Sequence, residues 1–318
     1  MNALPARTIL LAFLGIVVLG GFNGTAIRLS SAELAPFWGG ALRFGLASLI
    51  FFAIVVARRV PLPRGRALVG SLIYGLLGFG IVFGLVYWGV IEAGAGMAQV
   101  VLALAPLLTL LLAVVQGIER FRLQSLLGSL VAISGIALAF IERAGAQVIS
   151  LALLAILLGA VAIAEANVVI KRFPRSNPIS NNAVAMGAGA LLLIAFSLIA
   201  KEPWVIPQRL ETQLSVGYLV LVGSVVVFTL FLIVIERWTA SATSYSFLLM
   251  PLVSVLAAAA ILGEPITPAL VVGGALVIVG VYLGAFAPSF SRPLPGLLRR
   301  AEPAPAEGPP TLISPNCP

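Results

Sequence analysis

Apolar stretches of about twenty residues recur ten times along the chain, and short segments rich in polar and charged residues separate them. A helix needs roughly 20 apolar residues to cross the hydrocarbon core of a bilayer, because each residue adds about 1.5 Å. The pattern therefore predicts an all-α integral membrane protein with ten transmembrane helices. We place these helices at residues 8–27, 36–57, 67–88, 97–118, 124–141, 148–170, 181–200, 214–235, 240–262 and 268–286.

The second half of the chain repeats the first at an offset of 144 or 145 residues. The matched positions include Asn23 with Asn167, Pro106 with Pro251, Gly128 with Gly273, and Gly135 with Gly280. Each copy holds five predicted helices, an odd number, so the two copies enter the membrane with opposite orientations. We therefore predict two inverted five-helix repeats, at residues 8–141 and 148–286. Inverted repeats are typical of secondary transporters, whose substrate sites lie near the midplane between the halves.

Composition agrees with a chain whose solvent is the bilayer. Hydrophobic residues make up 61% of the sequence and charged residues 9%, and the mean hydropathy is +1.14. Water-soluble domains of this length do not have such high hydrophobicity and so few charged residues. Residues 287–318 differ, because they are rich in Pro and show no apolar period, so we expect a disordered cytoplasmic tail there.

The basic residues predict the orientation of the chain. With the N-terminus inside, 14 of the 19 Lys and Arg residues fall in cytoplasmic segments. The positive-inside rule therefore places both termini in the cytoplasm, with the protein in a bacterial inner (plasma) membrane. The same bias explains the net charge of +8. We expect no nucleic-acid partner, because the charges are spread over short loops instead of one folded basic face.

Missing residue types narrow the chemistry. The chain has no His and no Asp, and its single cysteine is Cys317. This composition argues against zinc sites, catalytic triads and cysteine nucleophiles, so we expect neither an enzyme nor a bound metal or cofactor. The sequence also lacks a Walker-type phosphate loop. Uphill transport would therefore draw on an ion or substrate gradient.

Several short motifs resemble a known family. The run Gly20-Gly21-Phe22-Asn23-Gly24-Thr25-Ala26-Ile27-Arg28, followed by Ala41-Leu42-Arg43-Phe44, looks like the opening of EamA-type proteins of the drug/metabolite transporter superfamily. The paired segments Ala105-Pro106 to Glu119 and Met250-Pro251 to Glu264 add to this resemblance, which extends over about residues 8–286. It implies an inner-membrane permease, often an exporter of amino acids or other small metabolites, with a central cavity between the halves.

Two charged residues, Arg43 and Glu165, lie inside predicted spans. A charge at the bilayer centre costs roughly 2.5 to 3.5 kcal/mol on insertion scales, so both are candidates for substrate binding. The repeat partner of Glu165 is Gly21, which favours a proton carrier or a partner for a substrate ammonium over a purely structural hydrogen bond. Arg43 fits a substrate carboxylate or, as we weigh it, more readily a scaffold bond to carbonyls. We expect roughly 12 Å between them along the membrane normal, too far for an ion pair.

Neutral polar residues extend the candidate substrate site. Asn23 and Asn167 either hydrogen-bond neighbouring helices, as polar residues in bilayers commonly do, or help to gate the cavity. Gln99 and Tyr245 are candidates for lining the cavity.

Two prolines and two glutamates mark the fourth and ninth spans. Pro106 and Pro251 are expected to kink them, which would shape the cavity or supply hinges. Glu119 and Glu264 end the same spans, and we expect them to serve in helix termination and loop pairing.

The sequence thus predicts a secondary transporter that moves a small-molecule substrate by alternating access. We expect the protein to lie in the lipid bilayer. Protons are a candidate coupling ion, and the protein could assemble as a homodimer. The cargo, the direction of transport and the coupling ion stay open. The alternative is a non-transporting membrane scaffold or a small-molecule sensor.

Overall fold

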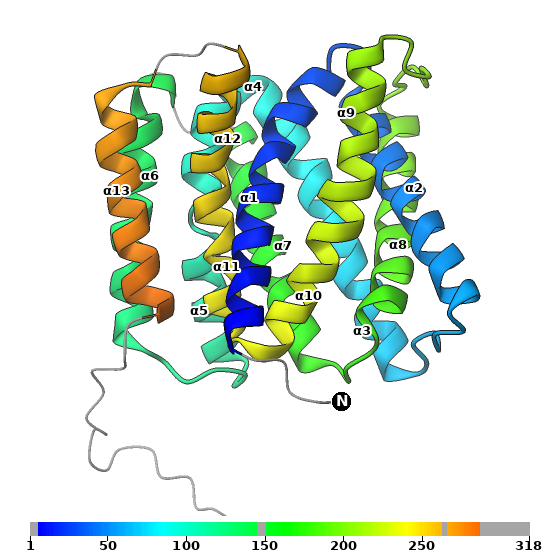
Figure 1. Ribbon diagram of the computed structural model, residues 1–318, viewed down its shortest axis with the longest axis horizontal. Coiled ribbons are helices and arrows are strands. Elements are labelled where there is room, and N and C mark those ends of the chain that lie inside the picture. The colour runs from blue at the N-terminus through cyan, green and yellow to red at the C-terminus, as the bar shows by residue number, and fades with distance from the viewer. Residues whose placement is uncertain (1–5, 145–150, 263–265, 287–318) are drawn as a thin grey trace, which may run out of the picture. The chain divides into compact units, whose positions relative to one another are not determined.

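The computed structural model describes residues 6–144, 151–262 and 266–286, and these residues form ten helical spans with no strand among them (Figure 1). The predicted tail at 287–318 and Glu264 lie outside the described residues. The elements are α1 (Ala6–Ser30), α2 (Pro36–Ala57), α3 (Arg66–Gly75), η1 (Leu76–Ile81), α4 (Val82–Leu102), α5 (Ala105–Val115), α6 (Leu123–Ala144), α7 (Leu151–Arg172), α8 (Pro178–Ile199), α9 (Leu210–Val220), η2 (Leu221–Val226), α10 (Val227–Arg237), α11 (Ala240–Ser244), α12 (Ser246–Leu262), α13 (Pro268–Val281) and η3 (Tyr282–Phe286).

The predicted fold class, all-α with ten spans, is confirmed, but one boundary differs. The backbone of α4 stays helical through residues 89–96, which the sequence assigned to the connection between the third and fourth spans. That segment contains no proline and only one charged residue, and its three glycines lower helix propensity without preventing helical backbone. The helix instead ends at Leu102, and α5 begins at Ala105 with Pro106 in its first turn. Proline is tolerated there because a first-turn N–H has no partner within the helix.

Equivalent helices of the two repeats pack against each other through glycines. A Cβ atom added at Gly135 would come within 2.6 Å of the Gly273 carbonyl oxygen, and one at Gly280 within 2.6 Å of the Gly128 carbonyl oxygen. The contacts run in opposite order along α6 and α13, so these helices are antiparallel, as an inverted repeat requires of the fifth and tenth spans. Figure 1 shows them side by side at one flank of the bundle.

The second and seventh spans, α2 and α8, form an equivalent pair at the other flank (Figure 1). The Ser48 hydroxyl donates to the Ala183 carbonyl oxygen at 2.7 Å, while Gly40 faces Leu193. Residue numbers again rise on one helix as they fall on the other, so α2 and α8 are antiparallel. The helix pair at each flank of the bundle therefore joins one repeat to the other.

A widened helical segment recurs at the same place in both repeats. The π-helical segments η1 (Leu76–Ile81) and η2 (Leu221–Val226) are separated by 145 residues at each end, which is the offset of the sequence repeat. They interrupt the third and eighth spans in the middle. π-helical turns are rare and often lie at functional sites.

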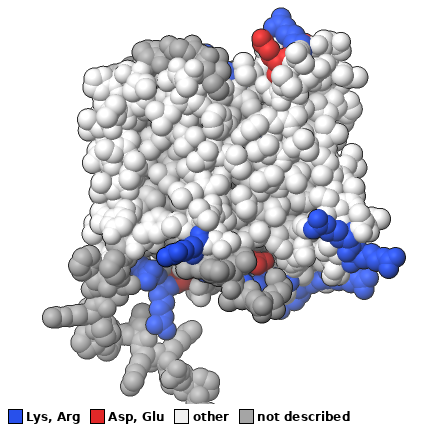
Figure 2. Space-filling model, in the orientation of Figure 1, with Lys and Arg blue, Asp and Glu red and all other residues white. Residues whose placement is uncertain are grey.

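In the view of Figure 2, the charged residues gather at the two ends of the bundle and leave a band without charged side chains between them. Most Lys and Arg side chains in this view lie at the end that holds the N-terminus (Figures 1 and 2). Large apolar side chains face outward in the band, among them Leu11 at 68% and Leu191 at 69% exposure. Outward-facing leucines are stable in lipid, so the band fits the hydrocarbon core of a bilayer.

Loop glutamates stabilise the starts of helices to which they do not belong. The Glu202 carboxylate accepts hydrogen bonds from the backbone N–H groups of Phe37 and Trp38 at 3.1 and 2.8 Å, at the start of α2. Glu119, after α5, accepts from the backbone N–H of Ser241 at 3.1 Å, at the start of α11. Helix N-termini expose unpaired N–H groups and carry partial positive charge, which a carboxylate satisfies. The loop-pairing role predicted for Glu119 agrees with this contact.

Candidate functional site: a cavity between the repeats

A cavity of about 710 Å³ lies between the two repeats. Its volume falls within the range typical of small-molecule sites, roughly 300 to 1,000 Å³. On α1 its lining runs from Gly20 to Ser30, which is about 15 Å of helix, or half of the hydrocarbon core. It also includes the exposed residues Arg28 and Ser31, at the end of α1 opposite the N-terminus. The cavity therefore reaches one end of the bundle and stops near the middle.

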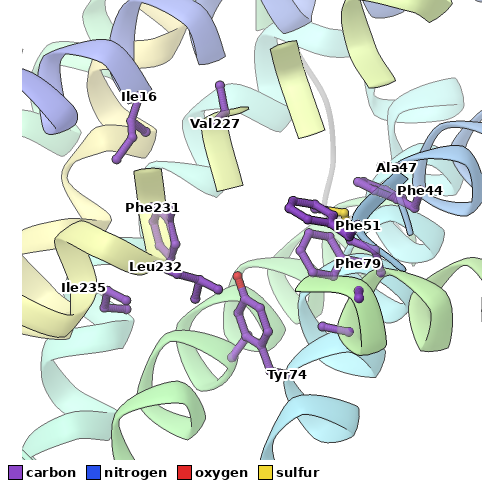
Figure 3. Close-up of a cluster of buried hydrophobic side chains, with 14 of the residues drawn as sticks. Ile16, Phe44, Ala47, Phe51, Tyr74, Phe79, Val227, Phe231, Leu232 and Ile235 are labelled. Atoms are coloured by element: carbon purple, nitrogen blue, oxygen red, sulfur yellow. The ribbon is translucent and has the colours of Figure 1, made fainter. Parts of the chain in front are cut away.

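Apolar side chains, some of which line the cavity, pack together at its inner end. Phe13 and Ile16 of α1 are buried among Phe231 and Ile235 of α10. Figure 3 shows Tyr74 between this α10 group and the aromatic cluster that contains Phe44 and Phe79. The N-terminal end of the bundle is thus closed in this structure.

Many lining residues occupy equivalent positions in the two repeats. The lining includes the pairs Asn23 and Asn167, Tyr74 and Leu219, Phe83 and Phe228, Leu102 and Phe247, and Ala105 and Met250. The first pair is offset by 144 residues and the others by 145. The cavity is therefore built around the same internal symmetry as the helices. Arg43 breaks that symmetry, because its repeat position falls at Gly187 or Ala188.

Arg43 of α2 is 3% exposed and lies on the cavity wall. Its Nε donates to the Ser224 hydroxyl at 2.8 Å, and Nη2 donates to the Gly223 carbonyl oxygen at 3.0 Å. Both partners belong to η2. The Tyr87 hydroxyl also interacts with the guanidinium. These partners are neutral, and no carboxylate among the described residues forms an ion pair with Arg43, so its positive charge is uncompensated.

Aromatic rings surround the Arg43 guanidinium. Its Cζ lies 4.9 Å from the ring centroid of Phe44 and 5.7 Å from that of Phe83. Phe79 and Phe228 continue the cluster, with ring centroids 4.8 Å apart. Phe79, Phe83 and Phe228 line the cavity. The wall beside Arg43 is therefore apolar and suited to an apolar or aromatic group, and the ring faces partly stabilise the cation.

Three polar atoms on the cavity wall have no hydrogen-bond partner. They are Asn23 Oδ1, Thr25 Oγ1 and Asn167 Nδ2. Thr25 and Asn167 are 6% and 3% exposed. Buried polar groups in folded proteins are nearly always paired, so an unpaired group needs an explanation, such as a ligand or a water. These atoms are buried in the residues that line the cavity, and they mark polar positions that the protein itself leaves unsatisfied.

Glu165 lies outside the cavity. It is two residues before Asn167 on α7, about 200° around the helix, so the two side chains leave opposite faces. Its Oε2 accepts from Gln116 Nε2 at 2.7 Å, and Gln116 Oε1 accepts from Arg172 Nη1 at 3.2 Å. This chain of contacts ties the end of α5 to the end of α7 at the closed end of the bundle.

The other predicted site residues divide between the cavity and the scaffold. Gln99 and Pro251 line the cavity. Tyr245 is 1% exposed and does not line it, because its hydroxyl donates to the Ser125 carbonyl oxygen at 2.8 Å and contacts the Ser129 hydroxyl at 2.9 Å. Pro106 is buried in the first turn of α5, beside the cavity residue Ala105.

Some site residues were missed by sequence reasoning. Gly223 and Ser224, which hold Arg43, and the aromatic pair Phe83 and Phe228 were not proposed. A signal for the pair exists, since the two phenylalanines are matched at the repeat offset of 145. No comparable signal marks Ser224, whose repeat partner is Phe79.

Comparisons with known proteins agree with this architecture. The model of the EamA-like transporter family matches residues 7–141 and 150–285. An uncharacterized transporter of Archaeoglobus fulgidus is 29% identical, over 84% of this chain and 95% of the relative. A probable terminal-alkyne amino-acid exporter of Streptantibioticus cattleyicolor is 31% identical, over 70% of this chain and 74% of the relative.

Two further matches bear on function and fold. A probable amino-acid metabolite efflux pump of Escherichia coli is 27% identical, over 85% of this chain and 92% of the relative. A solved crystal structure that is 23% identical covers 88% of this chain and 96% of its own, with a TM-score of 0.71, which shows the shared fold. The matched family and these named relatives are transporters and not enzymes, as the sequence predicted.

Proposed function

Because the chain belongs to the EamA-like transporter family, we propose that it is a secondary transporter that exports amino acids or related small metabolites across the bacterial inner membrane. The observation that carries this proposal is the cavity of about 710 Å³ shared by both repeats, with the uncompensated cation of Arg43 on its wall. The carboxylate common to amino acids and their relatives matches that cation. Two of the relatives described above are named as amino-acid or amino-acid metabolite exporters, which supports the substrate class.

Alternating access between the two halves is the proposed mechanism. The cavity reaches the bundle end opposite the N-terminus, and the other end is closed by packed side chains and by the contacts of Glu165 with Gln116 and of Glu119 with Ser241. Rocking of the repeats would break these contacts and open the cavity to the other side. With both termini in the cytoplasm, as the concentration of basic residues suggests, this structure represents an outward-facing state.

Proton coupling through Glu165 is part of the proposal. Glu165 contacts Gln116 at the closed end, so a change in its protonation would act on closure of that end instead of on the substrate directly. We expect Glu165→Gln to retain exchange of substrate but to lose acceleration by a pH gradient. Transport driven equally well by a pH gradient in wild type and variant would remove Glu165 from the mechanism.

Counterflow in proteoliposomes tests the proposal. Vesicles containing the purified protein are preloaded with a pool of amino acids and related carboxylic acids, and each labelled compound is then offered outside. Transient accumulation of a label is expected for wild type and for the control Arg58→Gln, whose arginine is exposed outside the cavity. Arg43→Gln is expected to lose accumulation. Absence of counterflow with folded protein would instead support the alternative, a non-transporting scaffold or sensor.

A further inference from the structure

The described residues that line the cavity carry positive charge and no negative charge. Arg28 and Arg43 are the charged residues that line it, and no glutamate stands among the described lining residues. The contacts of Arg43 are all with neutral groups, so this arginine carries an uncompensated charge. A ligand therefore meets a site that favours anions.

Arg43 has N–H donors that its contacts within the protein do not use. A guanidinium carries five N–H donors in a planar fork. Ser224, Gly223 and Tyr87 account for three contacts. The remaining donors suit a carboxylate, which is a preferred partner of arginine. Because its scaffold partners are neutral, a substrate carboxylate would be the first group to compensate this charge.

The cavity is poorly suited to binding an ammonium group. The unpaired acceptor Asn23 Oδ1 lies against Gly223, whose carbonyl oxygen accepts from Arg43. An ammonium at Asn23 would therefore lie close to the guanidinium, and two like charges in apolar surroundings repel strongly. Asn23 Oδ1 is itself buried, so it is not an exposed acceptor for an ammonium group.

Apolar surface accounts for most of the remaining wall near Arg43. Phe79, Phe83 and Phe228 belong to the aromatic cluster around the guanidinium, and Phe247 and Val255 of α12 also line the cavity. These side chains accept an apolar or aromatic body that extends away from the carboxylate. The site thus has one anion-binding group, neutral polar atoms and a large apolar wall.

We infer that the cavity recognises its substrate by the carboxylate and the apolar body, and that an α-ammonium group adds nothing to binding. The substrate class then includes apolar 2-oxo, 2-hydroxy and N-acyl carboxylic acids as well as the corresponding amino acids. This inference rests on the proposed function, because it names the substrate class of the same cavity.

Matched ligand series with one constant body test the inference. The aromatic series is phenylalanine, phenylpyruvate, 3-phenyllactate, 3-phenylpropionate, N-acetylphenylalanine and phenethylamine. The aliphatic series is leucine, 4-methyl-2-oxopentanoate and isopentylamine. Binding to the purified full-length protein is measured by ligand-dependent thermal stabilisation, and transport by competition in the counterflow assay. Each series separates the contribution of the carboxylate from that of the ammonium.

We expect acids without an ammonium to bind at least as tightly as the amino acid with the same body, and the amines to bind at least about tenfold more weakly. Arg43→Gln should remove binding of all acids alike, whereas Arg58→Gln should not. Amines that bind as well as the acids, or amino acids that bind more than about tenfold better than 3-phenylpropionate or its aliphatic counterpart, would overturn the inference but leave transport standing. If no member of either series binds or moves, the inference and the proposed export of carboxylates fail together.

Discussion

Arg43 donates from Nη2 to the carbonyl oxygen of Gly223 at 3.0 Å, which joins the second span of one repeat to the π-helical segment of the eighth span. Gly223 is the repeat partner of Gly78, which lies in the other π-helical segment and lines the cavity. The π-helical segment is thus present in both repeats, whereas the Arg43 cation is present in only one. The cavity is therefore symmetric in shape and asymmetric in charge, and the asymmetry orients an anionic substrate toward one wall.

The first prediction concerns Gly223 itself. A Cβ atom there would overlap Asn23 Oδ1 and come 3.3 Å from Arg43 Nη2. We expect Gly223→Ala to displace both side chains and to weaken substrate binding by about tenfold, which corresponds to about 1.4 kcal/mol. Gly217→Ala on the same span is the matched control, because a Cβ at Gly217 meets nothing within 4 Å. Equal affinities for the two variants, measured by thermal stabilisation with an added ligand, would contradict the prediction.

The helices were predictable from sequence because burial in lipid leaves a strong signal. Ten apolar stretches of sufficient length correspond to the ten spans of the structure. The repeat offset also located cavity residues, since Asn23 and Asn167 both line the cavity. These features depend on length, apolarity and internal similarity, which are all read directly from the chain.

The parts that the sequence did not reveal depend on helix phase and on local backbone. Glu165 and Asn167 are two residues apart, yet only Asn167 faces the cavity. Tyr245 is flanked by serines, as a cavity residue could be, but it lies in the short break between α11 and α12 and turns toward α6. Phase around a buried helix cannot be inferred from hydrophobicity when every face is apolar. Nor does composition predict where a helix widens into η1 or η2.

The glycine contacts between α6 and α13 predict a position-specific effect on stability. A Cβ at Gly273 would lie 2.5 Å from the Gly135 carbonyl oxygen, whereas one at the adjacent Gly274 would lie 3.6 Å from the Leu252 side chain. Gly273→Ala should therefore force the helices apart and destabilise the protein by about 1 to 3 kcal/mol. Gly274→Ala should leave the melting temperature unchanged or raise it. Thermal unfolding in detergent measures the melting temperatures of both variants. Equal melting temperatures would refute the close packing.

Substitutions of Tyr245 and Tyr87 are predicted to affect different properties, stability in the first case and substrate binding in the second. Tyr245→Phe removes a hydroxyl that donates to the Ser125 carbonyl oxygen and lies outside the cavity, so it should cost about 1 kcal/mol of stability and leave affinity unaltered. Tyr87→Phe removes a hydroxyl that interacts with Arg43 on the cavity wall, so it should change affinity more than stability. Thermal unfolding with and without ligand measures both quantities. A loss of affinity in Tyr245→Phe would return that residue to the substrate site.

The last prediction is a pH dependence at the end of the bundle opposite the N-terminus. Glu33 lies in the loop after α1, and its pKa is lowered from the ordinary value of 4.5, chiefly by a hydrogen bond from the Thr212 side chain and further by the backbone N–H groups of Arg209 and Gln208. A carboxyl whose pKa is lower in the folded protein stabilises the fold at pH values above its unfolded pKa, and this contribution is lost as the pH falls through the folded pKa. Wild type should therefore lose stability on acidification below about pH 4.5, and Glu33→Gln should lose less over the same range.

Thr212→Val provides the second arm of this experiment. It keeps the Glu33 carboxyl but removes its principal hydrogen-bond donor, a side chain that is 1% exposed. Its melting temperature should depend on pH less than that of wild type and more than that of Glu33→Gln, because the backbone donors remain. Melting temperatures recorded between neutral pH and about pH 3 give the comparison. Parallel pH profiles for all three proteins would show that the Glu33 contact does not link the first loop to the start of α9.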